Sequence, residues 1–544
     1  MSTIRDNLNF TFRDIPKLLA ILLGIFIIGL FFPSHGESNK IYQQGGLWNY
    51  EDLFVKQDFV ATVSRPAPDG SNNSVESLVS YGAGTPIVTK NQVIDNASYQ
   101  AIKQYYSEIK TGNSIFSSKG IIYFLGYLLL TALIIGALIL YAIKYFPEIC
   151  KTFRGVLFIL FWPVFFSALI YLVTHKSGIS PYMIPFCIVP IIVFNFFGGR
   201  LALLIHIVVI LICSFLSELG YEFTFLQILA GIITVLIVSE TRYWNRFFQS
   251  ILVIMLTYLL GFLGLALINS GSLVSNEYPI FGWLVINALL LLLAYPLIPL
   301  VERMFGFTSS ITLAELADMN NKLLREMSIK APGTLQHSLQ VSNLAEAATD
   351  RIGANSLLVK TAALYHDIGK MVQPELFIEN SKGVNHHEKL NNFESAKVII
   401  DHVNQGEIMA KKAGLPKLII DFITSHHGTT RVEYFYRNQK SAEPDKEFDE
   451  SLFRYPGPKP VTKEQTILMI ADSLEAASKS LKSPTGQDID KLVDKIVAYK
   501  IDQEQLSDSQ LSFNELEQCT TVFKQLLRNI NHVRVEYPDE NPES

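Results

Sequence analysis

Seven histidine and aspartate residues in the second half of the chain are of the types that bind divalent metal ions. Histidine occurs 11 times in the 544 residues, and eight of these lie after residue 300. Two adjacent pairs stand out, His366-Asp367 and His426-His427, while His337, His402 and Asp472 each stand alone. Imidazole nitrogen together with carboxylate oxygen suits ions such as Mn, Fe, Co or Zn.

The number of these residues favours a two-metal centre. Five histidines and two aspartates are too many ligands for one ion with an open position. They are the right number for two ions about 3.5–4 Å apart that activate a water molecule for attack on phosphorus. Any one histidine alone is more typical of an ordinary core or surface residue, and His532 is interpreted as such. The ordered set as a whole predicts metal-dependent phosphoester hydrolysis.

Helices must position these side chains. Hydrophobic periodicity and Gly or Pro breakers predict helices over 335–352, 356–370, 392–413, 416–427, 462–482 and 511–531, with a polar insert over 430–461. Strand-like alternation is scarce there, so the predicted fold class is all-α. Adjacent residues on a helix point about 100° apart. A His-Asp pair can therefore serve one ion only at a helix end, or with the carboxylate bridging two ions.

Composition divides the chain into two parts. Charged residues make up 17% of the chain, against about 25% in an ordinary soluble protein. Of the 95 charged residues, 63 lie after residue 300. A single soluble enzyme is excluded, and an apolar membrane part must precede an ordinary soluble part. The net charge of −5 gives no reason to expect a nucleic-acid polymer as partner.

The apolar part contains eight runs that could cross a membrane, for which about 20 apolar residues are needed. The runs cover 16–33, 120–144, 153–173, 181–198, 200–217, 224–239, 248–268 and 279–300. The first is interpreted as a retained anchor and not a cleaved signal peptide. His206 lies inside a run, and two interpretations stay open: a packed histidine, or part of a transport or proton-relay path.

The loops predict the orientation, because cytoplasmic loops are rich in Lys and Arg. Lys151, Arg200, Arg242 and Arg246 fall in loops on one side, whereas 174–180, 218–223 and 269–278 are poor in positive charge. We therefore expect both termini, and the soluble part with them, to be cytoplasmic.

The predicted domains follow from these runs. They are 1–33 (N-terminus and anchor), 34–119 (extracytoplasmic), 120–300 (seven spans), 301–333 (linker helix), 334–535 (catalytic domain) and 536–544 (acidic tail). Residues 34–119 are polar and weakly patterned, and they could sense a ligand, dock a partner or act as a tether. Residues 311–330 are expected to form one amphipathic helix, either one that carries conformational or dimer information or simply the first helix of the soluble domain.

The ordered ligand set resembles that of the HD-domain phosphohydrolases, whose ligand order is His, His-Asp, Asp. Further motifs are Pro332–Ser338, Tyr365–Lys370, Phe377–Asn380, His426–Thr430, Tyr434–Tyr436, Arg454–Pro458 and Ala471–Ala477. Together with the order of the domains, these motifs resemble the seven-transmembrane HD-domain (7TMR-HD) family of bacterial cyclic di-AMP phosphodiesterases.

The resemblance implies hydrolysis of cyclic di-AMP to pApA with two Mn or Fe ions, by a multi-pass protein of the bacterial inner membrane. It implies that His337, His366, Asp367 and Asp472 bind one ion, that Asp367 bridges, and that His402, His426 and His427 bind the other. Asp367 and Lys370 would be catalytic, and Lys370, His387 and Arg454 would contact substrate. The other interpretation of Lys370 is a surface lysine at a helix end. A homodimer is also expected.

Some features depart from the family. Asn385–Glu388 reads Asn-His-His-Glu where the family has Asn-Pro-His-Asp, and residues 34–119 are much shorter than the usual region. A Gly-Tyr-Pro signature, typical of the branch that cleaves cyclic di-GMP, does not follow His426-His427. Cyclic di-GMP as substrate stays a less favoured alternative. A further alternative is a receptor that binds a nucleotide without turnover.

Overall fold

The computed structural model describes most of the chain. The described residues are 14–32, 44–48, 50, 52–55, 57–66, 74–112, 118–175, 178–217, 219–238, 244–270, 278–381, 383–444, 446–481 and 484–530. The predicted acidic tail, His532 and the loop residue Arg242 lie outside them. The chain divides into two compact units, Met1–Phe307 and Thr308–Ser544.

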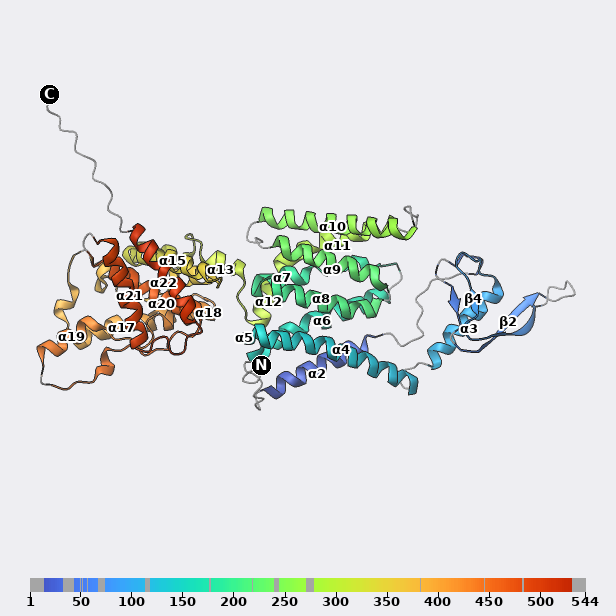
Figure 1. Cartoon of the computed structure of the whole chain (residues 1–544), viewed down its shortest axis with the longest axis horizontal. Helices are drawn as coiled ribbons and strands as arrows, with labels where there is room; N and C mark the ends of the chain where they lie inside the picture. Colours follow the sequence, from blue (N-terminus) through green and yellow to red (C-terminus); the bar gives the residue numbers. More distant parts are fainter. Residues whose placement is uncertain are drawn as a thin grey trace, which may run out of the picture. The chain divides into compact units, whose positions relative to one another are not determined.

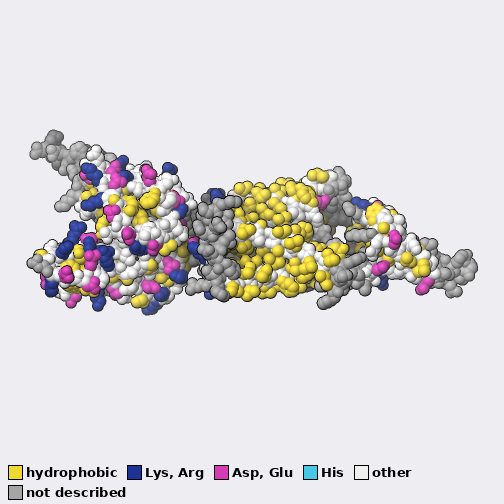
Figure 2. Space-filling view, turned by 60° about the horizontal axis from the view of Figure 1, so that its bottom comes forward, with side chains coloured by type: hydrophobic (Ala, Val, Ile, Leu, Met, Phe, Trp, Pro, Cys, Tyr) yellow, Lys and Arg dark blue, Asp and Glu magenta, His cyan; other side chains and the backbone are white. Residues whose placement is uncertain are grey.

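The first unit is mainly a bundle of apolar helices (Figure 1). They are α2 (Ile15–Leu30), α4 (Ser118–Tyr145), α5 (Pro147–Lys151), α6 (Phe153–Thr174), η2 (Pro181–Met183), α7 (Ile188–Phe197), α8 (Gly199–Ser217), α9 (Gly220–Ile237), α10 (Trp244–Ser270), α11 (Tyr278–Leu290), η4 (Leu291–Leu293) and α12 (Ala294–Phe305). Figure 2 shows hydrophobic side chains over the face of this bundle that is turned to the viewer.

Six helices in the described residues are long and apolar enough to cross a membrane. Two further apolar helices, Ile15–Leu30 and Pro181–Phe197, are shorter. The eight predicted runs therefore appear as six long helices and two short ones, and the crossing of the membrane by the short ones stays a prediction.

His206 is packed inside this bundle. Its side chain is fully buried, and its Nε2 lies 3.0 Å from the main-chain oxygen of Gln227 on the neighbouring helix. A Cβ added at Gly231 would lie 2.2 Å from the His206 ring, so a glycine is needed where α9 passes it. The side chain of Gln227 in turn accepts a hydrogen bond from Tyr258 at 2.7 Å. This environment favours the packed histidine over a relay.

Residues 44–112 form a small unit of strands and a helix. The elements are β1 (Leu53–Phe54), β2 (Phe59–Pro66), β3 (Ser74–Tyr81), β4 (Pro86–Val88) and α3 (Asn96–Gly112). The β2–β3 and β1–β4 pairs are antiparallel. Alternate residues Phe59, Ala61 and Val63 of β2 are buried in a shared core with α3. The sequence analysis described residues 34–119 only as polar and weakly patterned and did not predict these strands.

The second unit is helical throughout. Its helices are α13 (Ser310–Leu316), α14 (Lys322–Lys330), α15 (Pro332–Arg351), α16 (Ser356–Tyr365), η5 (Ile368–Val372), η6 (Pro374–Leu376), η7 (Ile378–Asn380), η8 (His386–Lys389), α17 (Asn392–Lys412), α18 (Lys417–Ser425), α19 (Glu433–Ala442), η9 (Glu450–Phe453), α20 (Lys463–Ser478), α21 (Gly486–Asp502) and α22 (Phe513–Ile530). The predicted all-α class is confirmed, apart from the small strands between residues 53 and 88.

The expected single helix over 311–330 is wrong. The segment forms two helices, α13 and α14, because Asp318 and Asn321 cap a turn between them. Asp318 Oδ1 accepts the main-chain N–H of Asn320 at 2.8 Å, and Asn321 Oδ1 accepts that of Leu323 at 3.1 Å. Leu313, Leu324 and Met327 belong to the core of the second unit, whereas Met319 and Ile329 are exposed.

Other predicted boundaries also need correction. The helix expected over 356–370 ends at Tyr365 and continues as η5, and the helix expected over 416–427 ends at Ser425. The polar insert contains α19 and η9, and α21 was not predicted at all.

Candidate metal centre and active site

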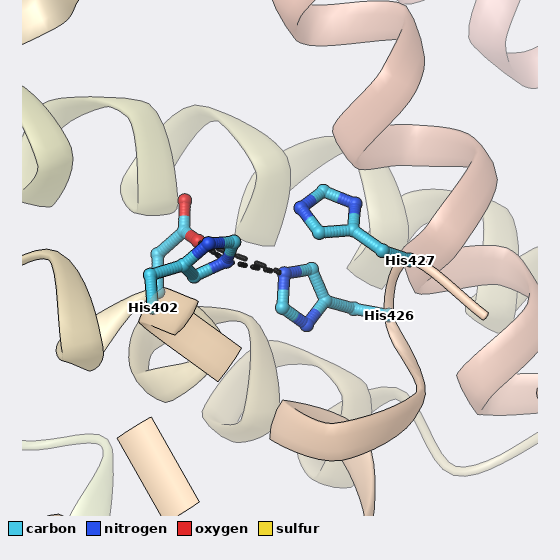
Figure 3. A group of neighbouring side chains, drawn as sticks. His402, His426 and His427 are labelled. Atoms are coloured by element: carbon cyan, nitrogen blue, oxygen red, sulfur yellow. Dashed lines mark hydrogen bonds and ion pairs between the residues drawn. The ribbon is translucent and has the colours of Figure 1, made fainter. Parts of the chain in front are cut away.

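The seven predicted ligands lie together inside the second unit. They form two groups that share Asp367, and within each group the ligand atoms lie within 4.8 Å of one another. The first ligand group is His337, His366, Asp367 and Asp472; the second ligand group is Asp367, His402, His426 and His427. Five different helices or helix ends supply these side chains. Figure 3 shows the rings of His402 and His426 facing each other, with His427 beside them.

Helix ends allow both adjacent pairs to point inward. His366 still has helical dihedral angles, but Asp367, with φ −109° and ψ 15°, has left the helix. Similarly, α18 ends at Ser425 and His426 is its cap. Because each pair lies where its helix ends, both members can reach one centre; the rings of His426 and His427 are 4.0 Å apart between centroids.

Hydrogen bonds fix the orientation of four histidine rings. The Nδ1–H groups of His366, His402 and His426 donate to main-chain oxygens three residues earlier, at 2.7, 2.5 and 2.8 Å respectively. His337 Nδ1 instead donates to Glu475 Oε2 at 2.5 Å. With Nδ1 occupied in this way, Nε2 is the nitrogen that each ring turns toward the centre, where it can bind a metal ion once it carries no proton.

Asp367 stands between the two groups and turns one oxygen to each. Its Oδ2 lies 3.2 Å from His366 Nε2 and 3.6 Å from His337 Nε2. Its Oδ1 lies 3.2 Å from His402 Nε2 and 3.6 Å from His426 Nε2. A carboxylate in this position is able to bridge two ions.

The electrostatics of the centre suit cations. Burial raises the pKa of Asp367, but the positive charges of His366 and Lys370 lower it by more than burial raises it. The pKa of Asp367 therefore lies well below its usual range. Burial raises the pKa of Asp472, but the hydrogen bond from His337 and the charge of His366 outweigh burial, so this pKa is also well below its usual range. Burial and the neighbouring histidine lower the pKa of His427. The centre therefore holds two ionised carboxylates.

The residues fit bound metal ions. Asp367 Oδ1 and His366 Nε2 are buried without a hydrogen bond of normal geometry. His402 Nε2 and His426 Nε2 face each other at 3.3 Å, although the Nδ1 atom of each ring carries its proton. Two unprotonated nitrogens cannot hydrogen-bond each other, whereas a cation satisfies both.

Lys370 is held at the edge of the centre as a fixed cation. Its Nζ lies 2.7 Å from Asp367 Oδ2 and 3.0 Å from Glu379 Oε1. Burial lowers the pKa of Lys370, but these two carboxylates raise it above its usual value. The neighbouring Asn380 caps α15, since its Oδ1 accepts the main-chain N–H groups of Gly333 and Thr334 at 2.9 and 3.3 Å. The segment 377–380 thus ties Lys370 to the helix that carries His337.

A pocket of about 950 Å³ opens beside the centre. Members of both ligand groups, Lys370 and His387 line it, as do the aromatic side chains Tyr434, Phe435 and Tyr455. His387 packs on Phe435 with ring centroids 5.0 Å apart, and its Nε2 lies 2.8 Å from the oxygen of Leu376. The pocket is large enough for a nucleotide.

Arg454 lies elsewhere. It does not line this pocket; its guanidinium pairs with Glu450 at 2.5 Å and donates to the oxygen of Thr429 at 3.1 Å. Its predicted contact with substrate stays a prediction.

Sequence reasoning missed Glu475, which binds His337. The side chain is 2% exposed and lies one helical turn after Asp472 on α20. The spacing of three residues, which puts both carboxylates on one face of the helix, is the signal that could have found it.

Metal binding should release protons. Burial lowers the pKa of His366, but Asp367 and Asp472 outweigh it and raise the pKa to about 10. The pKa of a histidine in the unfolded chain is about 6.5, so a raised pKa in the folded chain means that the protonated ring stabilises the metal-free fold. This stabilisation is fully present below pH 6.5 and is lost as the pH rises through 10. A metal ion must displace that proton, so we expect affinity for Mn²⁺ to rise between pH 7 and 9.

Calorimetry in buffers of different ionisation enthalpy measures the protons released. About one proton per chain is expected at pH 7. Release of no protons, with affinity independent of pH, would contradict this expectation.

Comparisons with known proteins give family matches for both parts of the chain. Residues 121–309 match the family model described as "7TM receptor with intracellular HD hydrolase", and residues 334–477 match the HD domain. The second match contains all seven ligands. An HD domain implies binding of divalent metal ions.

Two relatives are named cyclic-di-AMP phosphodiesterase PgpH. The chain is 31% identical over 468 residues to that of Listeria monocytogenes, covering 84% of this chain and 64% of the relative. It is 34% identical over 370 residues to that of Bacillus subtilis, covering 66% and 51%. The chain thus spans between about half and two thirds of the length of these relatives.

A crystal structure of the L. monocytogenes PgpH HD domain in complex with cyclic-di-AMP is 40% identical, covering 39% of this chain and 99% of that chain, with a TM-score of 0.38. The two family matches follow each other along the chain, and the six long apolar helices precede the HD domain. The chain is a multi-pass membrane protein that carries an HD domain after its apolar helices.

Proposed function

We propose that the chain is a membrane-bound phosphodiesterase that hydrolyses cyclic di-AMP to the linear dinucleotide pApA at a centre of two metal ions. The observation that carries the proposal is Asp367, with one oxygen toward each ligand group. The names of the relatives support cyclic di-AMP as the substrate.

The two ligand groups would each hold one ion, with Asp367 shared. Bound ions would supply Lewis-acid activation of water and would offset the charge that builds on the phosphoryl oxygens. Mn or Fe is proposed for both positions, because a set of imidazoles and carboxylates suits these ions.

The residues around the ions would orient the substrate. Lys370 keeps Asp367 in place and presents a positive charge at the pocket wall. Such a preorganised cation stabilises negative charge in the transition state more effectively than water does. His387, which packs on Phe435, would contact the substrate farther along the pocket.

We also propose the cytoplasmic side for both termini and the HD domain, in the inner membrane of a bacterium. Lys144, Lys151, Arg154 and Arg200 lie at helix ends that would face the cytoplasm, in accord with the positive-inside rule. Residues 34–119 would then lie outside the cytoplasm. The predicted domain boundaries and a homodimer are part of the same proposal.

Turnover by the full-length chain, purified in detergent and supplied with Mn²⁺, tests the proposed function. We expect pApA from cyclic di-AMP and at least tenfold slower cleavage of cyclic di-GMP. Faster cleavage of cyclic di-GMP would overturn the proposed substrate. Tight binding of cyclic di-AMP without cleavage, with metal bound, would instead indicate a receptor.

A further inference from the structure

Glu475 is a buried carboxylate that belongs to neither ligand group. It lies on α20 one turn after Asp472, and its side chain is 2% exposed. Its Oε2 accepts the Nδ1–H of His337 at 2.5 Å, and its Oε1 pairs with Lys479 Nζ at 2.6 Å. Lys479 is about half exposed and stabilises a charge that would otherwise be costly to bury.

This partner distinguishes His337 from the other oriented histidines. His366, His402 and His426 donate Nδ1–H to neutral main-chain oxygens of their own helices. A hydrogen bond to a carboxylate is stronger, and it makes the imidazole a more basic metal ligand. Because Glu475 lies 138 residues from His337, the bond also fixes α15 against α20 at the centre.

The two ligand groups also differ in their number of carboxylates. The first ligand group has Asp367 and Asp472, and Glu475 lies directly behind it. The second ligand group has three imidazoles and only the shared Asp367. In a buried site, where charges interact strongly, a divalent ion gains more at the group with more anionic charge.

We propose that Glu475 is a positioning residue for His337 that makes the two metal sites unequal, so that the first ligand group binds its ion earlier and more tightly. The inference rests on the proposed two-metal centre. The exposed end of this arrangement, Lys479, lines the same pocket as the ligands.

A calorimetric titration of the metal-free full-length chain with Mn²⁺ tests the inference. The unmodified chain should show two resolved steps, and His337→Ala should remove the tighter one. Glu475→Gln keeps an oxygen near Nδ1 but removes the charge, and it should weaken the tighter step by about 10- to 100-fold while leaving the weaker step unchanged. Glu475→Asp, which retains the charge at a greater distance, should weaken the tighter step less.

Glu407→Gln is the matched control. Glu407 pairs with Lys411 four residues later on α17, also at 2.6 Å, but on the surface and away from the ligands. Both steps should be unchanged in this variant, and a melting temperature shows whether each variant is folded.

Three results would overturn the inference: two steps of equal affinity in the unmodified chain, no effect of Glu475→Gln in a folded sample, or weakening of the second step instead. Two bound ions with normal cleavage of cyclic di-AMP, but no effect of Glu475→Gln, would refute only the role of Glu475. A single bound ion and no cleavage would refute the proposed function as well.

Discussion

Replacing Asp367 by asparagine is expected to remove metal from both ligand groups and to abolish hydrolysis of cyclic di-AMP. Asparagine has the same shape, but it is neutral and offers an oxygen to only one group, while an amide N–H would face the other. Replacing a residue that orients a metal ligand typically lowers metal affinity or activity 10- to 100-fold. The loss of a shared ligand should therefore exceed about 100-fold in kcat/KM, because it affects both ions.

Metal analysis and turnover of the full-length variant measure this effect. Asp421→Asn is a suitable control, since Asp421 lies on α18 near the centre but pairs with the exposed Lys417 at 2.6 Å. The control should keep both ions and its activity. Retention of two ions and near-normal turnover in Asp367→Asn would show that Asp367 does not bridge.

Replacing Gly369 by alanine should destabilise the second unit and disturb the second ligand group. A Cβ at this position would lie 1.9 Å from the main-chain oxygen of His402 and 2.5 Å from the main-chain nitrogen of Gly406. Main-chain atoms of a helix cannot move aside independently, so η5 and α17 must separate. Overpacking of this kind costs about 1–3 kcal/mol, and it would move His402 away from Asp367.

The melting temperature of the full-length chain and its metal content report the two consequences. A loss of about 2–4 °C per kcal/mol is expected for a unit of this size, together with weaker binding of the second ion. Gly486→Ala is the control, because the nearest atom to its added Cβ, on Arg528, is 3.7 Å away. Unchanged melting and full metal binding in Gly369→Ala would contradict the close approach of these two helices.

The ligands could be predicted from the sequence because chemistry restricts them. Adjacent His-Asp and His-His pairs are uncommon, and each pair needs a helix end to serve one centre. The structure ends α16 at Tyr365 and α18 at Ser425, directly before these pairs. Residue type and local spacing selected the seven side chains only together with the resemblance to HD-domain proteins, since the adjacent pair His386-His387 belongs to neither ligand group.

Contacts between distant segments could not be predicted in this way. Glu475 and His337 are 138 residues apart, and nothing in either local sequence couples them. Helix α21 was missed because its buried residues form one narrow stripe in a highly charged segment: Ile489, Val493, Val497 and Lys500. The break between α13 and α14 depends on side-chain capping by Asp318 and Asn321, which the apolar periodicity does not reveal.

The most direct test of the two-metal phosphodiesterase is to count bound metal ions and identify the product from cyclic di-AMP in the same sample of the full-length chain. Two ions per chain and pApA as the product are expected, with both lost in Asp367→Asn. Two ions per chain without cleavage of cyclic di-AMP, or cleavage that persists after all metal has been removed, would contradict it.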